Sequence, residues 1–179
     1  MKNELKELFK SIVIAVLATF LIITFIFQTV SVDGTSMVNT LHNRDRLIVE
    51  KVSYYFRSPK LGDIIVFKYP KDQNEKYIKR VIGVAGDKVR IEKDHVYVNG
   101  KLLVEPYAYF DNSLDNNDPR VHYMDEVVVP KNTVFVLGDD RYNSSDSRFM
   151  DRVGFVDKKL IIGRAALRIY PFSDVGRIE

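Results

Sequence analysis

Residues 11–32 read SIVIAVLATFLIITFIFQTVSV, an uncharged and strongly apolar run that is followed directly by Asp33-Gly34-Thr35-Ser36-Met37. At about 1.5 Å per residue, a helix of this length matches a hydrocarbon core of roughly 30 Å. The run therefore predicts one transmembrane anchor over residues 11–32. Ser36 follows almost at once, so any chemistry that it performs takes place near the membrane surface.

The charges that flank the run predict its orientation. Three lysines lie in residues 1–10, so the positive-inside rule keeps this segment in the cytoplasm and places residues 33–179 on the outer side of the membrane. A removable signal peptide is the alternative, with Thr29 and Ser31 as the small residues of a cleavage site. We favour the retained anchor, because the apolar region of a signal peptide spans about 7 to 15 residues and no A-x-A pattern follows this run.

The composition excludes several classes of site. The chain has no cysteine, which rules out disulfides, thiolate catalysis and cysteine metal sites. The net charge of +3 is scattered along the chain, and no nucleic-acid-binding motif is present, so we expect no nucleic-acid partner. Residues 33–179 suffice for one ordinary domain, which we expect to be monomeric and to need neither cofactor nor metal ion.

Short apolar segments between turn residues predict a β-rich domain. The strand candidates are residues 46–50, 64–69, 76–82, 88–92, 95–98, 101–104, 127–129, 133–137 and 160–170. Asn99-Gly100 supplies the two positive φ angles of a type I′ turn and predicts a hairpin. We predict a mainly β, antiparallel, barrel-like or sandwich-like domain behind one N-terminal transmembrane helix.

Residues 105–126 (EPYAYFDNSLDNNDPRVHYMDE) interrupt the strand pattern and are predicted to form a surface insertion. The four aromatic residues in this segment permit three interpretations: a lid, a surface that contacts the membrane, or a plain insertion. We favour the plain insertion, because the polar residues outnumber the aromatic ones.

Ser36 is the first candidate nucleophile, and a serine nucleophile needs a base. The histidines are His42, His95 and His122. None of them lies in a recognisable triad context, although the members of a triad meet in space and not in sequence. A Ser-His-Asp site therefore stays open.

Lys79 is the better candidate base. Strand alternation places Lys79 on the face of Tyr77 and Val81, and Arg80 on the opposite face. A lysine pressed against apolar neighbours loses hydration, which lowers its pKa, and Ser-Lys pairs are a known protease variant. The alternative is an edge strand whose two cations reach solvent, and the strand pattern alone favours that alternative.

Residues 138–148 (GDDRYNSSDSR) form a dense polar loop with acidic, basic and hydroxyl side chains. Such a loop can be exposed turn structure. Equally, buried arginine-carboxylate pairs can hold a loop in one shape, and a serine within it can aim a lysine.

These segments together resemble the sequence boxes of bacterial type I signal peptidases. The similar segments are residues 34–41 (GTSMVNTL), 77–83 (YIKRVIG) and 138–148, with residues 62–67 (GDIIVF) similar to a fourth box. They occur in the right order across most of the chain, and three boxes together are far more specific than one. The single anchor is similar to the short Gram-positive type.

The resemblance implies particular functions for individual residues. It makes Ser36 the nucleophile and Lys79 the general base. It implies that Ser144 orients the lysine, and that two ion pairs, Asp146 with Arg148 and Asp139 with Arg80, brace the site.

The chain departs from the family pattern at three positions. Asn39 stands where the family usually has proline, and Asp140 stands where it usually has asparagine. Both are framework positions, so the departures bear on the rigidity of the turns more than on the chemistry. Gly34 stands where part of the family has a serine that donates to the oxyanion, so the second oxyanion donor is unassigned.

We therefore expect a membrane-anchored serine endopeptidase that removes signal peptides from exported preproteins after small residues, with preproteins and the lipid bilayer as partners. One alternative is a noncatalytic membrane-anchored β-domain that binds a partner, which predicts that Ser36 and Lys79 lie far apart. A self-cleaving Ser-Lys repressor is disfavoured, because the anchor occupies the place of its DNA-binding domain.

Overall fold

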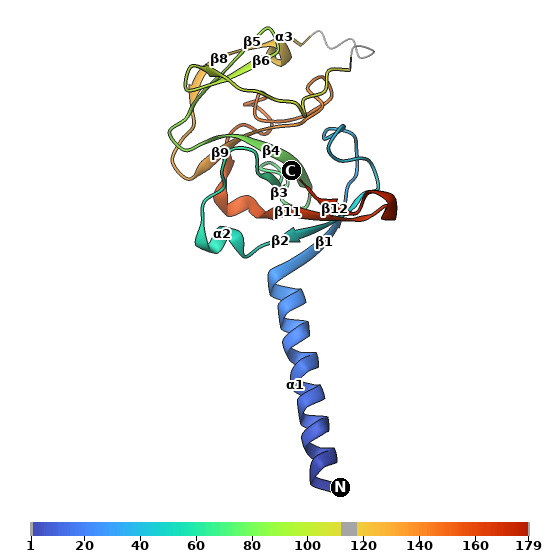
Figure 1. The fold of residues 1–179 in the computed structure, drawn as a ribbon. Helices are drawn as coiled ribbons and strands as arrows, with labels where there is room; N and C mark the ends of the chain where they lie inside the picture. Colours follow the sequence, from blue (N-terminus) through green and yellow to red (C-terminus); the bar gives the residue numbers. More distant parts are fainter. Residues whose placement is uncertain (1, 112–117, 179) are drawn as a thin grey trace.

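The structure, a computed structural model, describes residues 2–111 and 118–178. One long helix projects from a body built of two antiparallel sheets (Figure 1). The elements in chain order are α1 (Lys2–Ile26), β1 (Phe27–Ser31), β2 (Arg46–Glu50), α2 (Ser53–Phe56), β3 (Ile64–Lys68), β4 (Lys76–Val84), β5 (Lys88–Glu92), β6 (His95–Val98), β7 (Lys101–Leu102), α3 (Pro119–His122), β8 (Tyr123–Val128), β9 (Thr133–Leu137), β10 (Val156–Asp157), η1 (Lys158–Leu160), β11 (Ile161–Tyr170), η2 (Phe172–Asp174) and β12 (Gly176–Arg177).

The apolar run 11–32 does not form a single helix. Helix α1 starts earlier than predicted, at Lys2, and ends at Ile26. The run then continues as β1, which pairs antiparallel with β2 in a register that places Phe27 opposite Glu50. A strand forms because β2 supplies backbone partners, and because Thr29 and Val30 are β-branched and fit a pleated surface. Among the described residues, no helix combines the length and hydropathy that a membrane span requires.

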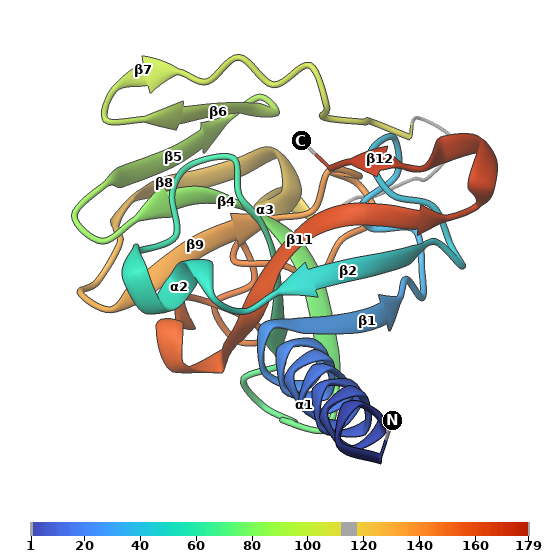
Figure 2. The ribbon, with the colours of Figure 1, turned by 60° about the horizontal axis from the view of Figure 1, so that its bottom comes forward.

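The body contains two separately hydrogen-bonded sheets. The large sheet has the order β1-β2-β11-β3-β4-β9-β10, with β12 added at β11, and the small sheet has the order β7-β6-β5-β8. Viewed along α1, the strands β1, β2 and β11 lie side by side, whereas β5 to β8 form a separate group (Figure 2). The antiparallel, mainly β prediction is confirmed. No barrel is closed among the described residues, because the path of the large sheet stays open.

Strand β4 is buried on both faces, so its charged residues Lys79 and Arg80 lie in the protein interior. Val81 packs in one core cluster with Ile65 and Val136, while Ile82 packs in a second cluster that joins the two sheets. Lys79 and Arg80 come just before these residues and are buried with them, at 4% and 2% exposure. Both cations must therefore find partners inside the protein.

The predicted hairpin is confirmed, and the excursion after it is more structured than predicted. Asn99 and Gly100 have φ values of 53° and 76°, as a type I′ turn requires. The last part of the segment 105–126 forms α3 and the first residues of β8. Residues 112–117 lie outside the described part of the chain.

Candidate active site

Ser36 lies in the turn that follows β1. This turn is held by the hydrophobic core and by the polar loop 138–148. Met37 and Leu41 are buried in a third core cluster, which fixes the turn against the large sheet. The Ser36 carbonyl oxygen accepts a hydrogen bond from the backbone N–H of Asp140 at 3.1 Å, which fixes the turn against the polar loop 138–148. The backbone of the serine is thus held by two parts of the chain that are distant in sequence.

Asn39 explains one departure from the family pattern. Its φ is +62°, in the left-handed region that asparagine tolerates better than most residues. Proline is confined to φ near −65°, so it cannot adopt this conformation. The turn therefore takes a shape here that asparagine can adopt and proline cannot.

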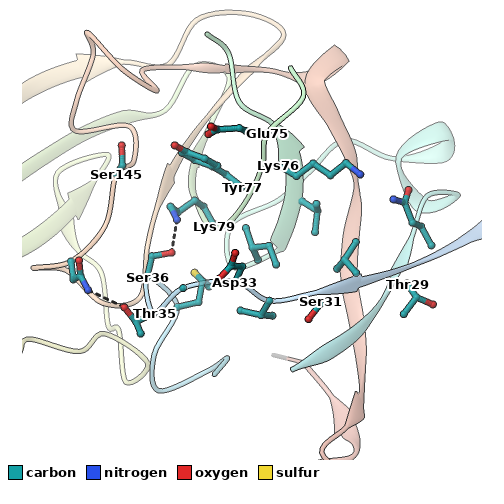
Figure 3. Close-up of a pocket in the computed structure, with 18 residues that line it drawn as sticks. Thr29, Ser31, Asp33, Thr35, Ser36, Glu75, Lys76, Tyr77, Lys79 and Ser145 are labelled. Atoms are coloured by element: carbon teal, nitrogen blue, oxygen red, sulfur yellow. Dashed lines mark hydrogen bonds between the residues drawn. The ribbon is translucent and has the colours of Figure 1, made fainter. Parts of the chain in front are cut away.

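Lys79 faces Ser36 directly. Its Nζ donates a hydrogen bond to Ser36 Oγ at 2.6 Å (Figure 3). The predicted alternative, a lysine whose ammonium reaches solvent, is wrong, because the Lys79 side chain is buried and its ammonium contacts Ser36. The noncatalytic reading, which required Ser36 and Lys79 to lie far apart, is contradicted by the same distance.

The burial of Lys79 changes its protonation. Desolvation disfavours the ammonium form and lowers the pKa of Lys79 from 10.5 to about 8, although the charges of Asp146 and Asp139 oppose this shift. A lysine with this pKa is about one-tenth neutral at pH 7, far more than an ordinary lysine, and only the neutral amine can accept a proton.

The histidines do not take the place of Lys79. His122 Nδ1 is paired with Asp94 Oδ1 at 2.7 Å, away from the serine. His42 and His95 are exposed. Within the described chain, the side chain bonded to the Ser36 hydroxyl is Lys79 and not a histidine, so the geometry disfavours a Ser-His-Asp site.

The first predicted ion pair joins β4 to the polar loop. Arg80 Nε and Nη2 donate to the two oxygens of Asp139 at 2.9 and 2.8 Å. Thr40 Oγ1 also donates to Asp139 Oδ2, at 2.5 Å, so the same carboxylate holds the serine turn. The guanidinium lies under the ring of Tyr107, with 3.8 Å from Arg80 Cζ to the ring centroid. This pair links three segments of the site.

The second predicted ion pair lies within the loop. Arg148 Nε and Nη2 donate to the two oxygens of Asp146 at 2.9 and 2.8 Å, and both residues are buried. The Gly138 N–H donates to Asp146 Oδ2 at 3.1 Å. Burial alone raises the pKa of Asp146, but the charge and hydrogen bonds of Arg148 outweigh it and hold this pKa below its usual value. Asp146 is therefore a carboxylate.

Ser144 does not make the contact that the resemblance implied. Its Oγ is buried, and among the described residues it makes no hydrogen bond to Lys79 in this conformation. Ser144 packs instead against Gly138, where a Cβ atom would lie 2.2 Å from Ser144 Oγ and 2.6 Å from the Ser36 carbonyl oxygen. Glycine at 138 therefore allows the close approach of the loop to the serine.

Sequence reasoning missed a third buried ion pair, between the loop and the segment 105–111. Arg141 Nη1 and Nη2 donate to the carboxylate of Glu105 at 3.0 and 2.6 Å. The Arg141 N–H also donates to the Tyr109 carbonyl oxygen, and the Tyr109 N–H to that of Asp139. Residues 105–111 of the predicted insertion therefore pack on the polar loop. No local sequence pattern joins Glu105 to an arginine 36 residues away.

Asp140, which stands where the family usually has asparagine, makes a hydrogen bond within the polar loop 138–148. Its Oδ1 accepts a hydrogen bond from the Asn143 N–H at 3.2 Å, while its own N–H holds the Ser36 carbonyl. Burial raises the pKa of Asp140. Its side chain thus shapes the segment that carries Asn143 to the edge of the site.

A cleft of about 790 Å³ passes Ser36. It is lined by residues 28–37, Val66, residues 75–79, Asn143 and Ser145. In the described chain, β1 pairs only with β2, and residues 76–79 of β4 pair only with β3. Two unpaired strand edges therefore flank the cleft, and an extended peptide can pair with such edges.

Comparisons with known proteins agree on one family. The family model "Signal peptidase, peptidase S26" matches residues 5–170. Signal peptidase I S of Bacillus subtilis is 40% identical over 97% of this chain and 94% of its own length. Signal peptidase IB of Staphylococcus aureus is 35% identical over 97% of this chain and 94% of its own length. A crystal structure of a signal peptidase I from Enterococcus faecalis, 30% identical, covers 60% of this chain and 97% of its own, with a TM-score of 0.49.

Proposed function

The chain belongs to the bacterial signal peptidase I family, peptidase S26, whose members are serine endopeptidases that remove signal peptides, and we propose that Ser36 is its nucleophile and Lys79 its general base. The observation that carries this assignment is the 2.6 Å hydrogen bond between Lys79 Nζ and Ser36 Oγ, made by a lysine that is 4% exposed. A buried amine with a lowered pKa, in contact with a hydroxyl, is the arrangement that activates a serine without histidine.

The chemistry follows from this pair. Neutral Lys79 takes the proton of the Ser36 hydroxyl as Oγ attacks the scissile carbonyl carbon, and the backbone N–H of Ser36 donates to the oxyanion. The lysine ammonium then gives the proton to the leaving amine, which releases the mature chain and leaves an ester on Ser36. Lys79 next takes a proton from water, the resulting hydroxide attacks the ester, and the proton returns to Ser36 as the signal peptide departs.

The two predicted ion pairs hold the segments that carry Ser36 and Lys79 in position. Asp139 with Arg80 ties β4 to the serine turn through Thr40, and Asp146 with Arg148 holds the loop that packs on the Ser36 backbone. We assign these four residues to positioning, because none of them lies within the lining of the cleft. Ser144 belongs to the same layer and fills the space beside Gly138.

The cleft suits an extended substrate. The segment before the scissile bond would lie between the free edges of β1 and β4, with main-chain hydrogen bonds on both sides. Small side chains at the two positions that define a signal cleavage site would fit beside apolar members of the lining such as Met37 and Ile78.

The pH dependence of cleavage tests the general base. Because only neutral Lys79 accepts the proton, kcat/KM for a model preprotein is expected to rise about tenfold per pH unit and to level off above about pH 8. The measurement is cleavage by the full chain in detergent between pH 5.5 and 10, with the new N-terminus sequenced. A midpoint near pH 6.5, the usual histidine value, would contradict the assignment and reopen the triad.

We also propose that α1 anchors the enzyme in the membrane, with residues 1–10 in the cytoplasm and residues 33–179 on the outer side. The support is that Leu8, Phe9 and Phe20 of α1 are more than half exposed, and that none of these three belongs to a core cluster of the described residues. Membrane fractions washed with alkaline carbonate are expected to retain the protein. Its release by the wash, or protection of residues 33–179 from external protease in intact cells, would contradict this placement.

A further inference from the structure

Thr35 and Asn143 form a hydrogen-bonded pair at the edge of the cleft that the reaction described above does not use. Asn143 Nδ2 donates to Thr35 Oγ1 at 2.9 Å, across 108 positions of sequence. Both side chains are exposed and both line the cleft. The pair joins the turn that carries the nucleophile to the polar loop.

The position of the pair relative to Ser36 identifies the part of the substrate that it meets. In Figure 3, Thr29 and Ser31 lie on one side of Ser36, whereas Thr35 and Ser145 lie on the other. The side of Thr29 is the end at which α1 joins β1. The apolar part of a signal peptide lies with α1 in the membrane, so its extended tail reaches Ser36 past Thr29. The residues that follow the scissile bond then lie over Thr35 and Asn143.

The pair is held rigidly with respect to the nucleophile. The N–H of Asn143 donates to Asp140 Oδ1, and the N–H of Asp140 donates to the Ser36 carbonyl oxygen. Next to Asn143, the Tyr142 hydroxyl donates to Asp94 Oδ2 at 3.2 Å, which ties the loop to the segment between β5 and β6. A ligand at this place therefore meets groups whose distance from Ser36 is fixed.

The chemistry of the pair indicates what it binds. A primary amide has two N–H donors and a carbonyl acceptor, and a threonine hydroxyl donates as well as accepts. After the bond between them is made, one amide N–H, the amide oxygen and the hydroxyl hydrogen remain to bond a ligand. These groups match the backbone and a short polar side chain of a peptide. A large apolar side chain would instead cover both polar groups and leave them without water.

We propose that Thr35 and Asn143 form the subsite for the first residue of the mature protein and select a small or polar side chain there, an inference that rests on Ser36 being the nucleophile. The pair selects the residue after the scissile bond. The small residue before the bond lies on the other side of Ser36 in the cleft and is not selected by the pair.

The test compares two model preproteins that differ only in the first residue after the cleavage site, serine or leucine, with the full chain in detergent. The parent is expected to cleave the serine substrate with the higher kcat/KM. Asn143→Ala and Thr35→Val are each expected to reduce the serine-to-leucine ratio about threefold to tenfold, the usual effect of one hydrogen bond. The double variant is expected to change it no more than either single variant, because the two residues act as one unit.

Matched controls separate selection from a structural effect. Thr133→Val removes a hydroxyl on β9 that bonds to the Pro130 carbonyl, and Asn74→Ala removes a turn amide that bonds to Asp72, both outside the cleft. Both controls are expected to keep the parental ratio. In a second substrate pair, alanine and valine before the bond, the Thr35 and Asn143 variants are expected to keep the parental preference within about twofold.

One result would overturn the proposal: an unchanged serine-to-leucine ratio, either with kcat/KM retained on both substrates or with an equal loss on both, which would show a merely structural effect. The failure of the proposed function looks different. If Ser36→Ala still cleaves these substrates, the nucleophile is wrong. If Ser36→Ala is inactive and the ratio is unchanged in the Thr35 and Asn143 variants, only the subsite is wrong.

Discussion

Lys79→Met is expected to lower kcat/KM by about 10³-fold or more while making the fold no less stable at pH 7. Methionine matches the unbranched shape of lysine and fits an apolar environment, but it cannot accept the proton of Ser36. The loss of activity therefore reports the base and not the packing. Ser36→Ala, which removes the nucleophile, is expected to be at least as inactive.

The stability of this variant follows from the pKa of Lys79. In the unfolded chain this pKa is near 10.5, and in the folded protein burial lowers it to about 8. Between these values the unfolded state binds more protons, so the free energy of unfolding of the parent rises with pH. Below pH 8 the parent bears the full cost of a buried ammonium, on the order of 3 kcal/mol. Methionine removes this cost.

Unfolding by urea, followed by the fluorescence of the ten tyrosines, measures the difference. The midpoint of Lys79→Met is expected to lie at or above that of the parent at pH 7, and the gap is expected to shrink as pH rises from 8 to 10.5. A variant that is both inactive and strongly destabilised would mean that Lys79 is charged and structural. A variant that still cleaves at the parental rate would refute the dyad.

The elements that depend on local signals could be predicted from the sequence. The strand at residues 88–92 and the turn at Asn99-Gly100 have the predicted bounds, because period-two alternation and positive-φ residues are local features. The boundary inside residues 11–32 could not be predicted from hydropathy. Apolar side chains suit a lipid-facing helix and a sheet strand equally, and β1 forms because β2 is available as a partner.

The site was predictable in its residue types and less so in its geometry. The sequence shows that Lys79 lies two residues after Tyr77 in an apolar strand, but its burial involves segments that are distant in sequence, among them the turn that carries Ser36. The strand pattern alone therefore favoured the exposed alternative, and only the resemblance of three segments reversed that preference. Glu105 with Arg141 was not predictable, because the loop offers several arginines and acids and spacing does not choose among partners that meet in space.

Asp146→Asn and Arg148→Met are expected to be the most destabilising of the site variants and to move the pH profile of cleavage in opposite directions. Each substitution leaves one buried charge without its partner, which costs about 3 to 5 kcal/mol. In the Asp146→Asn variant, Arg148 faces an amide in place of a carboxylate. In the Arg148→Met variant, Asp146 keeps only the hydrogen bonds that do not come from the guanidinium, such as that from the Gly138 N–H. Urea unfolding measures both losses. Glu126→Gln, which breaks the exposed pair with Lys88, is the control and is expected to leave the midpoint nearly unchanged.

The opposite shifts arise because both residues act on Lys79. The charge of Asp146 raises the pKa of Lys79 and that of Arg148 lowers it. Removing the carboxylate should therefore move the midpoint of the kcat/KM profile below the parental value of about 8, and removing the guanidinium should move it above. The residual activity of each variant, assayed at low temperature where it stays folded, gives these midpoints. Shifts in the same direction, or no shift in either variant, would mean that the pair shapes the loop but does not set the protonation of the base.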